Sequence, residues 1–144
     1  MVALKGVSIG HFQPETRRAL GMLTAPEERL GHAAAPDMSL VDNAVLTAQT
    51  RRKLARNGWL NMRKAASFSD EIIARFDVRT PGNHVAARAL SGGNLQKYVI
   101  GREVLQSPDV LVVNQPTWGV DAAAAASIRQ ALRDLAANGA AVLV

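Results

Sequence analysis

The chain contains no cysteine and few aromatic residues. Without cysteine among its 144 residues, it can form neither disulfides nor thiolate metal sites, and a reducing compartment is permitted. Aromatic residues make up only 4% of the sequence and hydrophobic residues 48%, so the core of one domain must consist mostly of Ala, Val, Leu and Ile. This composition favours helices packed on a parallel sheet over a β-sandwich.

Long hydrophobic runs are also missing. The longest apolar stretches, such as residues 110–113 and 140–144, are far shorter than the roughly 20 residues needed to span a bilayer. Residues 1–10 lack the extended apolar segment and the small-residue cleavage site of a signal peptide. We therefore expect the protein to be cytoplasmic.

Acidic residues are absent between residues 51 and 64, where the positive charge of the chain is concentrated. The whole sequence has 17 Lys and Arg against 12 Asp and Glu, a formal charge of +5. A solvated helix face, a contact with an acidic loop of a membrane-embedded partner and a nucleic-acid interface would each explain the excess. The basic residues of this stretch are Arg51, Arg52, Lys53, Arg56, Arg63 and Lys64.

Three regions differ in composition, and the first, residues 1–46, is rich in proline, glycine and turns. Pro14 is expected to open a short helix that Gly21 ends, followed by a brief strand at residues 22–23. Ser39 is expected to cap a second helix, because apolar residues recur at helical spacing after it.

The second region, residues 47–88, is basic and predicted to be helical. Ser69 is expected to cap an amphipathic helix with Asp70 and Glu71 in its first turn, where the helix dipole favours negative charge. Residues 80–83, Thr-Pro-Gly-Asn, break the chain after this helix.

The third region, residues 89–144, is the most regular. A helix is predicted after Ser91-Gly92-Gly93, and a second one ends at Gly139. Two apolar runs are predicted to be buried parallel strands joined by a right-handed crossover. The predicted order is helix 94–106, strand 110–113, helix 122–138 and strand 140–144.

The string Leu90-Ser91-Gly92-Gly93-Asn94-Leu95-Gln96-Lys97 carries the first candidate site. Glycines let the backbone approach a phosphate closely, a helix N-terminus supplies free N–H groups, and Ser91 adds a hydroxyl donor. A serine and two glycines before a helix are also common as a plain capping turn. Spacing alone leaves both interpretations open.

A second string, residues 110–121, places polar side chains at the end of a buried strand. Asn114 and Gln115 follow the apolar run directly, at the position where open α/β sheets bind ligands. The alternative is an ordinary exit from a strand into a turn, punctuated by Pro116 and Gly119.

Taken together, in this order and at this separation, the two strings resemble the signature motif and the Walker B segment of ABC-type ATPases. Gly119-Val120-Asp121 resembles the D-loop that follows. Residues 25–29, Ala-Pro-Glu-Glu-Arg, resemble the Pro-Glu-Asp-Arg segment near the Q-loop of sugar and nucleoside importers. Residues 39–46 and 76–81 resemble further segments of that subfamily, so the resemblance covers nearly the whole chain.

The resemblance implies an α/β fold: a partial P-loop NTPase (ABC ATPase) fold with a parallel sheet and an inserted α-helical subdomain. Residues 1–46 would form a Q-loop-like region and residues 47–88 the helical subdomain. Residues 89–144 would supply the signature helix, the Walker B strand, the D-loop and the following βαβ unit. No Gly-x-x-x-x-Gly-Lys-Ser/Thr occurs, so the Walker A strand, loop and helix are lacking. No switch histidine follows the D-loop, and we expect a fragment of a second nucleotide-binding domain, cut at both ends.

The resemblance also implies ATP and Mg²⁺ as cofactors, both bound in a complete dimer. The expected partners are another nucleotide-binding domain and transmembrane permease subunits, at the inner face of the cell membrane; no nucleic acid is expected. Glu27 would be the Q-loop-like residue, and Gly119 and Asp121 would belong to the D-loop. The expected nucleotide-binding residues are Ser91, Gly92, Gly93, Asn94 and Gln96.

Two positions depart from the family pattern, because Asn114 and Gln115 stand where Walker B carries acidic residues. Gln115 occupies the position of the catalytic base, and an amide cannot accept a proton at neutral pH. Since general-base catalysis contributes about 10²–10⁴-fold, this chain alone is expected to be inactive, with no metal site of its own. Its expected role is to contribute the signature motif to a composite ATP site of a sugar or nucleoside importer.

The basic stretch would lie in the helical subdomain, near the surface that receives the permease. Trp59 and Met62 would pack either in the groove of that partner or, for Trp59, in the core. The alternatives to the importer hypothesis are a non-catalytic module that binds nucleic acid through residues 51–64, and a decayed, truncated fragment that folds poorly.

Overall fold

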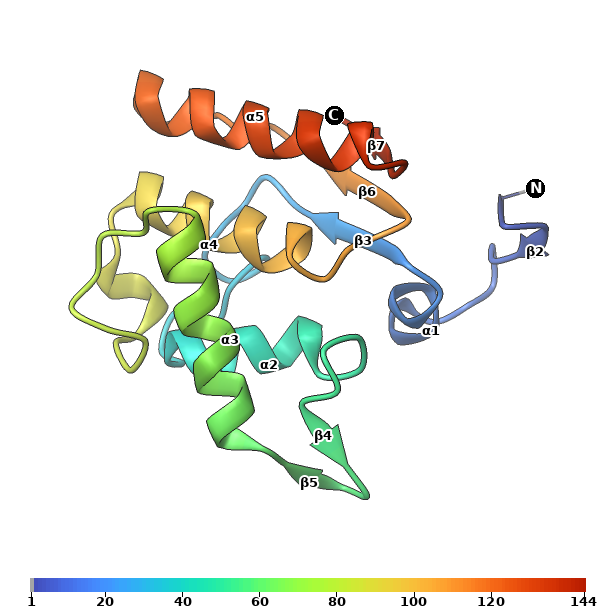
Figure 1. Cartoon of the computed structure of the whole chain (residues 1–144), viewed down its shortest axis with the longest axis horizontal. Helices are drawn as coiled ribbons and strands as arrows, with labels where there is room; N and C mark the ends of the chain where they lie inside the picture. Colours follow the sequence, from blue (N-terminus) through green and yellow to red (C-terminus); the bar gives the residue numbers. More distant parts are fainter. Residues whose placement is uncertain (1) are drawn as a thin grey trace.

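A three-stranded parallel sheet lies at the centre of the computed structural model, which describes residues 2–144. The strands are β3 (Met22–Ala25), β6 (Val110–Val113) and β7 (Ala141–Leu143), in the order β3-β6-β7 (Figure 1). Helix α5 (Ala122–Ala137) connects β6 to β7. The predicted strand-helix-strand unit with two parallel strands is therefore confirmed.

Only one face of this sheet is fully covered. Leu23, Leu111 and Val113 are buried on that face, whereas Val110 and Val112 on the other face are partly exposed. The prediction that residues 110–113 are buried on both sides is therefore wrong for one side.

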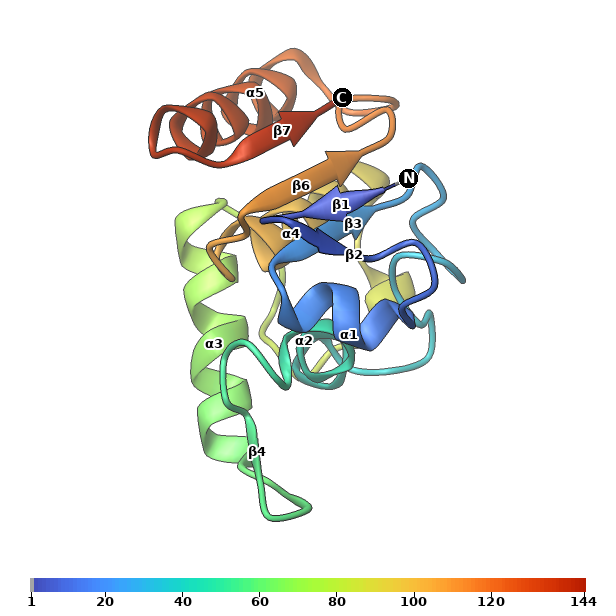
Figure 2. The same ribbon diagram turned by 90° about the vertical axis from the view of Figure 1, so that its right-hand side faces the viewer.

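A hairpin of β1 (Ala3–Leu4) and β2 (Val7–Ser8) lies in front of β3 and β6 in Figure 2. Its turn residue Lys5 forms an ion pair with Asp109, directly before β6, with 2.7 Å between Nζ and Oδ1.

The last strand, β7, is exposed, although the sequence predicts a buried one. Ala141 and Leu143 are exposed and only Val142 is half-buried. The reason is topological, because β7 pairs with β6 on one side and, within residues 2–144, with no strand on the other. An apolar run shows that a strand can be buried, but its neighbours decide whether it is.

The two helices predicted in the first region are present. Helix α1 (Pro14–Ala19) begins with its proline and is followed by Gly21, whose φ of +101° ends it. Helix α2 (Leu40–Ala48) begins after Ser39, whose hydroxyl accepts a hydrogen bond from Asp42 N at 3.0 Å.

The second region differs from the prediction in two ways. Residues 55–60 form a hairpin of β4 (Ala55–Arg56) and β5 (Trp59–Leu60), turning at Asn57-Gly58 with φ of 52° and 81°. Asn-Gly is the turn that suits a two-residue hairpin, so these residues are not helical. Helix α3 (Met62–Arg75) begins directly after Asn61, whose side chain caps it.

Ser69 therefore does not cap a helix but lies in the middle of α3. It is fully buried, and its hydroxyl is 2.8 Å from the hydroxyl of Tyr98. Tyr98 lies on α4 (Gly92–Val104) and donates a hydrogen bond to the carbonyl of Leu40 at 2.6 Å. The three side-by-side helices α2, α3 and α4 are thus joined by one buried polar chain, and burial raises the pKa of Tyr98 to about 12.

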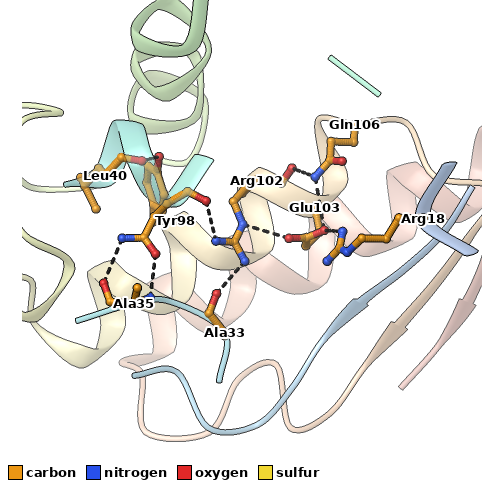
Figure 3. Close-up of polar contacts among 9 residues, drawn as sticks. Arg18, Ala33, Ala35, Leu40, Tyr98, Arg102, Glu103 and Gln106 are labelled. Atoms are coloured by element: carbon orange, nitrogen blue, oxygen red, sulfur yellow. Dashed lines mark hydrogen bonds and ion pairs between the residues drawn. The ribbon is translucent and has the colours of Figure 1, made fainter. Parts of the chain in front are cut away.

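The central helix α4 also carries a buried ion pair (Figure 3). Arg102 Nε donates to Glu103 Oε1 at 2.9 Å, and its other nitrogens donate to the carbonyls of Asn43 and Ala33 at 3.0 and 2.7 Å. Arg18 of α1 donates to Glu103 Oε2 at 2.8 Å. Burial lowers the pKa of Arg18, and the Glu103 carboxylate opposes that shift. This network joins α1, α2 and the loop before α2 to α4.

Two residues of the basic stretch have structural roles. Arg51 donates to the carbonyls of Gln106 and Ser107 at 3.2 and 2.7 Å, and Arg52 to the carbonyl of Leu105 at 3.2 Å. These carbonyls lie at the end of α4, where cations are favoured. The interpretation of the whole stretch as a solvated or docking face is therefore wrong for these two residues.

Across residues 2–144, no helix combines the length and apolar character required to cross a bilayer. A short 3₁₀ helix, Ala87–Ala89, precedes Ser91. The helix predicted over residues 94–106 is present as α4, which begins two residues earlier at Gly92.

Candidate functional site

The fold brings the two candidate strings together. Gln96, in the first turns of α4, donates to the carbonyl of Pro116 at 2.9 Å. A Cβ on Gly93 would lie 3.9 Å from Val120. A cavity of about 270 Å³ is bordered by residues of both strings, among them Ser91, Gly93 and Asp121. The start of α4 and the segment after β6 therefore form one site.

The Ser91–Gly93 turn leaves the beginning of α4 open to solvent. Ser91 and Gly92 are exposed, and the first N–H groups of a helix have no partner within it. The hydroxyl of Ser91 accepts hydrogen bonds from the backbone N and the side-chain amide of Asn94, at 3.4 and 2.9 Å. The side-chain oxygen of Asn94 in turn accepts from Arg79 N at 2.9 Å. The turn is thus fixed in shape while its outer side remains free.

Gln96 has a different position from the one expected of a nucleotide-binding residue. Its side chain is 2% exposed and lies behind the turn. Both ends of its amide are used internally, since the nitrogen donates to Pro116 and the oxygen accepts from Arg29 Nε at 2.9 Å. Gln96 can therefore support the turn but does not face an incoming ligand.

Asp121 caps the following helix. Its Oδ1 accepts a hydrogen bond from Ala124 N at 2.8 Å, and this bond lowers the pKa of the Asp121 carboxyl. The side chain is exposed beside Ser91 and Gly93. Gly119, two residues earlier, has a φ of +64°, a conformation that L side chains rarely adopt.

Asn114 and Glu27 meet where β3 and β6 end side by side. Asn114 Nδ2 is 3.4 Å from Glu27 Oε2, as neighbouring carboxyl ends of a parallel sheet allow. Gln115 is exposed and has a φ of 50°. Asn114 and Gln115 border a cavity of about 700 Å³ that also contacts Arg129 and Arg133 of α5.

The strand-end residues do not by themselves fit a Mg²⁺ site. Mg²⁺ is usually held by one or two carboxylates together with substrate phosphates, and here the Glu27 carboxylate contacts the neutral amide of Asn114. Among the described residues, no three His, Cys, Asp or Glu side chains gather as a metal site.

Arg29 is a site residue that the sequence did not single out. Its Nη2 donates to the carbonyl of Trp118, and its Nε donates to Gln96. Its signal in the sequence is its place as the arginine that ends residues 25–29, the segment that resembles Pro-Glu-Asp-Arg. It contacts both candidate strings, although it belongs to neither.

The chain is similar in sequence to ATP-binding proteins of nucleoside and sugar import, while no protein-family model matches it. The chain is 33% identical over 143 residues to the guanosine import ATP-binding protein NupO of Bacillus subtilis, covering 99% of the chain and 28% of NupO. It is 38% identical over 119 residues to the nucleoside import ATP-binding protein NupA of Lactococcus lactis, covering 83% and 24%. The arabinose import ATP-binding protein AraG of Rhizobium johnstonii is 35% identical over 144 residues, covering 99% and 28%. The chain thus spans about a quarter of the length of these relatives.

Solved structures agree on the fold. The dimeric, post-hydrolysis ATP-binding cassette MJ0796 bound to ADP and Pi has a TM-score of 0.72 at 17% identity, covering 98% of this chain and 60% of that one. An ATP-binding subunit of an ABC transporter has a TM-score of 0.72 at 19% identity, covering 98% and 53%. The chain is therefore related in sequence to a segment of the ATP-binding proteins of sugar and nucleoside importers, and it carries part of the ABC ATPase fold.

Proposed function

We propose that this chain is part of the ATP-binding component of an importer for a sugar or a nucleoside. Its role is to contribute the Ser91–Gly93 turn to an ATP site that a second nucleotide-binding domain completes. The observation that carries the proposal is the open N-terminus of α4, held beside the exposed Asp121. A helix N-terminus with glycines and a hydroxyl suits a phosphate.

In this proposal, the chain binds the terminal phosphate of an ATP held by its partner. ATP would bring the phosphates and Mg²⁺. The N–H groups of Gly92 and Gly93 and the hydroxyl of Ser91 would donate to a phosphate oxygen, because they are the free donors of the turn. Asp121 would lie at the seam between the two domains.

Hydrolysis at the strand exit of this chain is expected to be poor. Asn114 and Gln115 are neutral, and Glu27 contacts Asn114 through its carboxylate. The chain therefore supports a composite site in which its turn serves the nucleotide of its partner. The proposed substrate class is supported by relatives named as ATP-binding proteins of guanosine, nucleoside and arabinose import.

Replacing Ser91 by arginine tests this role in the assembled transporter. The long side chain would fill the open side of the turn, so we expect ATPase activity to be abolished. Ser67→Arg is the matched control, because Ser67 is exposed on α3 outside the site, and it should leave the activity unchanged. ATPase activity retained in the Ser91 variant would refute the assignment.

The proposed permease contact involves the β4–β5 hairpin, which projects from the opposite end of the molecule to α5 (Figure 1). Trp59 at its tip is 82% exposed, which excludes the core position considered for it. Leu60 and Met62 are also exposed, and Arg56 and Arg63 are exposed cations beside them. An apolar tip with a basic border suits a groove that has acidic edges.

Reversing the charges of this hairpin tests the contact. Arg56→Glu with Arg63→Glu is expected to lower co-purification of the permease about tenfold or more, and Trp59→Ser should add to the loss. Arg129→Glu with Arg133→Glu, on exposed positions of α5, is the control and should retain binding. Undiminished binding by the hairpin variants would refute the contact. Nucleic-acid binding that falls steeply with salt would instead favour the alternative of a nucleic-acid module.

A further inference from the structure

Arg29 joins three segments that are far apart in the sequence. It follows β3, it donates from Nε to Gln96 of α4 at 2.9 Å, and it donates from Nη2 to the carbonyl of Trp118. Gln96 in turn donates to the carbonyl of Pro116 at 2.9 Å. The segment 116–118 is thus bound to α4 at two carbonyls through one continuous set of hydrogen bonds.

Gly92 and Gly119 have no side chains, and the Arg29 guanidinium occupies the space where their Cβ atoms would lie. A Cβ on Gly92 would lie 2.7 Å from Arg29 Nη1, and a Cβ on Gly119 would lie 3.0 Å from Nη2. Carbon and nitrogen atoms cannot approach so closely without a shift of the side chain. The guanidinium therefore lies between the first residue of α4 and the D-loop-like segment, in contact with both.

We propose that Arg29 is a positioning residue that fixes the Ser91–Gly93 turn and the segment 116–119 in one arrangement. A planar guanidinium offers donors in a rigid fork, so one side chain can hold Gln96 and the Trp118 carbonyl together. Lysine has a single donor group at its end and cannot reproduce both bonds in the same geometry. Hydrogen bonds from a charged donor are also stronger than neutral ones.

The consequence for function rests on the proposed function. If the turn binds the phosphate of a partner and Asp121 lies at the domain seam, Arg29 makes these two contact points move together. A disturbance at either one is then passed to the other through Arg29. The arrangement itself needs no nucleotide, because every contact lies within the chain.

The arrangement can be tested in this chain without nucleotide. The chain has two tryptophans. One of them, Trp118, is 67% exposed, and its backbone carbonyl accepts the hydrogen bond from Arg29. In a Trp59→Phe background, Trp118 fluorescence reports on this segment alone. We expect Arg29→Gln and Arg29→Lys to speed exchange of the Trp118 amide, which donates to the carbonyl of Gln115 at 3.0 Å, about tenfold to a hundredfold and to increase quenching of Trp118 by acrylamide.

A double-mutant cycle separates positioning from general stability. Gly92→Ala adds a methyl group against the guanidinium, whereas alanine at a helix start is otherwise harmless or stabilising. We expect Gly92→Ala to loosen residues 116–121 when Arg29 is present and to have no effect in the Arg29→Gln chain. Arg88→Gln, which removes an exposed ion pair with Asp37, is the control and should change neither readout.

Unchanged exchange and quenching in the Arg29→Gln chain, or additive effects of Arg29→Gln and Gly92→Ala, would overturn the proposal. Faster exchange over the whole chain, rather than at the Trp118 amide, would also overturn it, since that result indicates a general loss of stability. These readouts contain no nucleotide, so their failure is distinct from retained ATPase activity in Ser91→Arg, which would overturn the proposed function alone.

Discussion

Replacing Glu103 by glutamine is expected to lower the free energy of unfolding by about 3–5 kcal/mol. Glu103 is fully buried and pairs with Arg102, which is 2% exposed, and with Arg18. Glutamine keeps the size of the side chain but removes its charge. The guanidinium of Arg102 would then be buried without a counter-charge, which costs far more than the loss of one hydrogen bond.

Urea unfolding followed by circular dichroism measures this change. Asp37→Asn is the matched control, because it also converts an acid that pairs with an arginine to an amide. The Asp37 carboxylate is 2.7 Å from Arg88, but both side chains are at least two-thirds exposed, so its loss should cost less than about 1 kcal/mol. Similar losses for both variants would mean that burial does not govern the energy of the Glu103 pair.

Stability is expected to fall steeply between pH 10 and pH 12, because Tyr98 is buried. An unfolded tyrosine has a pKa of about 10, and the folded chain raises the pKa of Tyr98 to about 12. Above pH 10 the unfolded chain therefore releases its proton before the folded chain does. The stabilisation is complete below pH 10 and is lost as the pH rises through 12, by about 2–3 kcal/mol.

Tyr98 is the only tyrosine, so absorbance of the phenolate at 295 nm follows this group alone. The titration midpoint should lie near 12 in the folded chain and near 10 in urea. In Tyr98→Phe the pH-dependent loss attributed to this group should disappear, although the variant starts from a lower stability because Ser69 and the Leu40 carbonyl lose their partner. A midpoint near 10 in the folded chain would contradict the buried position of the hydroxyl.

Local chemistry explains why the helix starts near Ser39 and Ser91 are predicted correctly from the sequence. Ser39 and Ser91 each precede a helix and accept a hydrogen bond from the third residue after them, so their capping role needs no knowledge of distant residues. Ser69 shows the limit of such reasoning. It has acidic residues after it, as a cap would, but packing of α3 against α4 places its hydroxyl beside Tyr98.

The candidate site also combines features that local sequence determines with features that depend on distant residues. The Ser91–Gly93 turn is a local feature and was predicted. The position of Gln96 was not, because its burial depends on Arg29 and Pro116, which lie 67 and 20 residues away. Likewise, the sequence shows six cations in one stretch, but it does not show that Arg51 and Arg52 donate to carbonyls at the end of α4.

The backbone at Gln115 limits which residues can follow β6. With a φ of 50° at a residue that has a Cβ, the peptide holds a conformation that costs on the order of 1–2 kcal/mol. Branching at Cβ would raise this cost further, so valine, isoleucine and threonine are disfavoured at the position directly before Pro116. The backbone after β6 thus favours unbranched side chains or glycine at residue 115, whatever charge they carry.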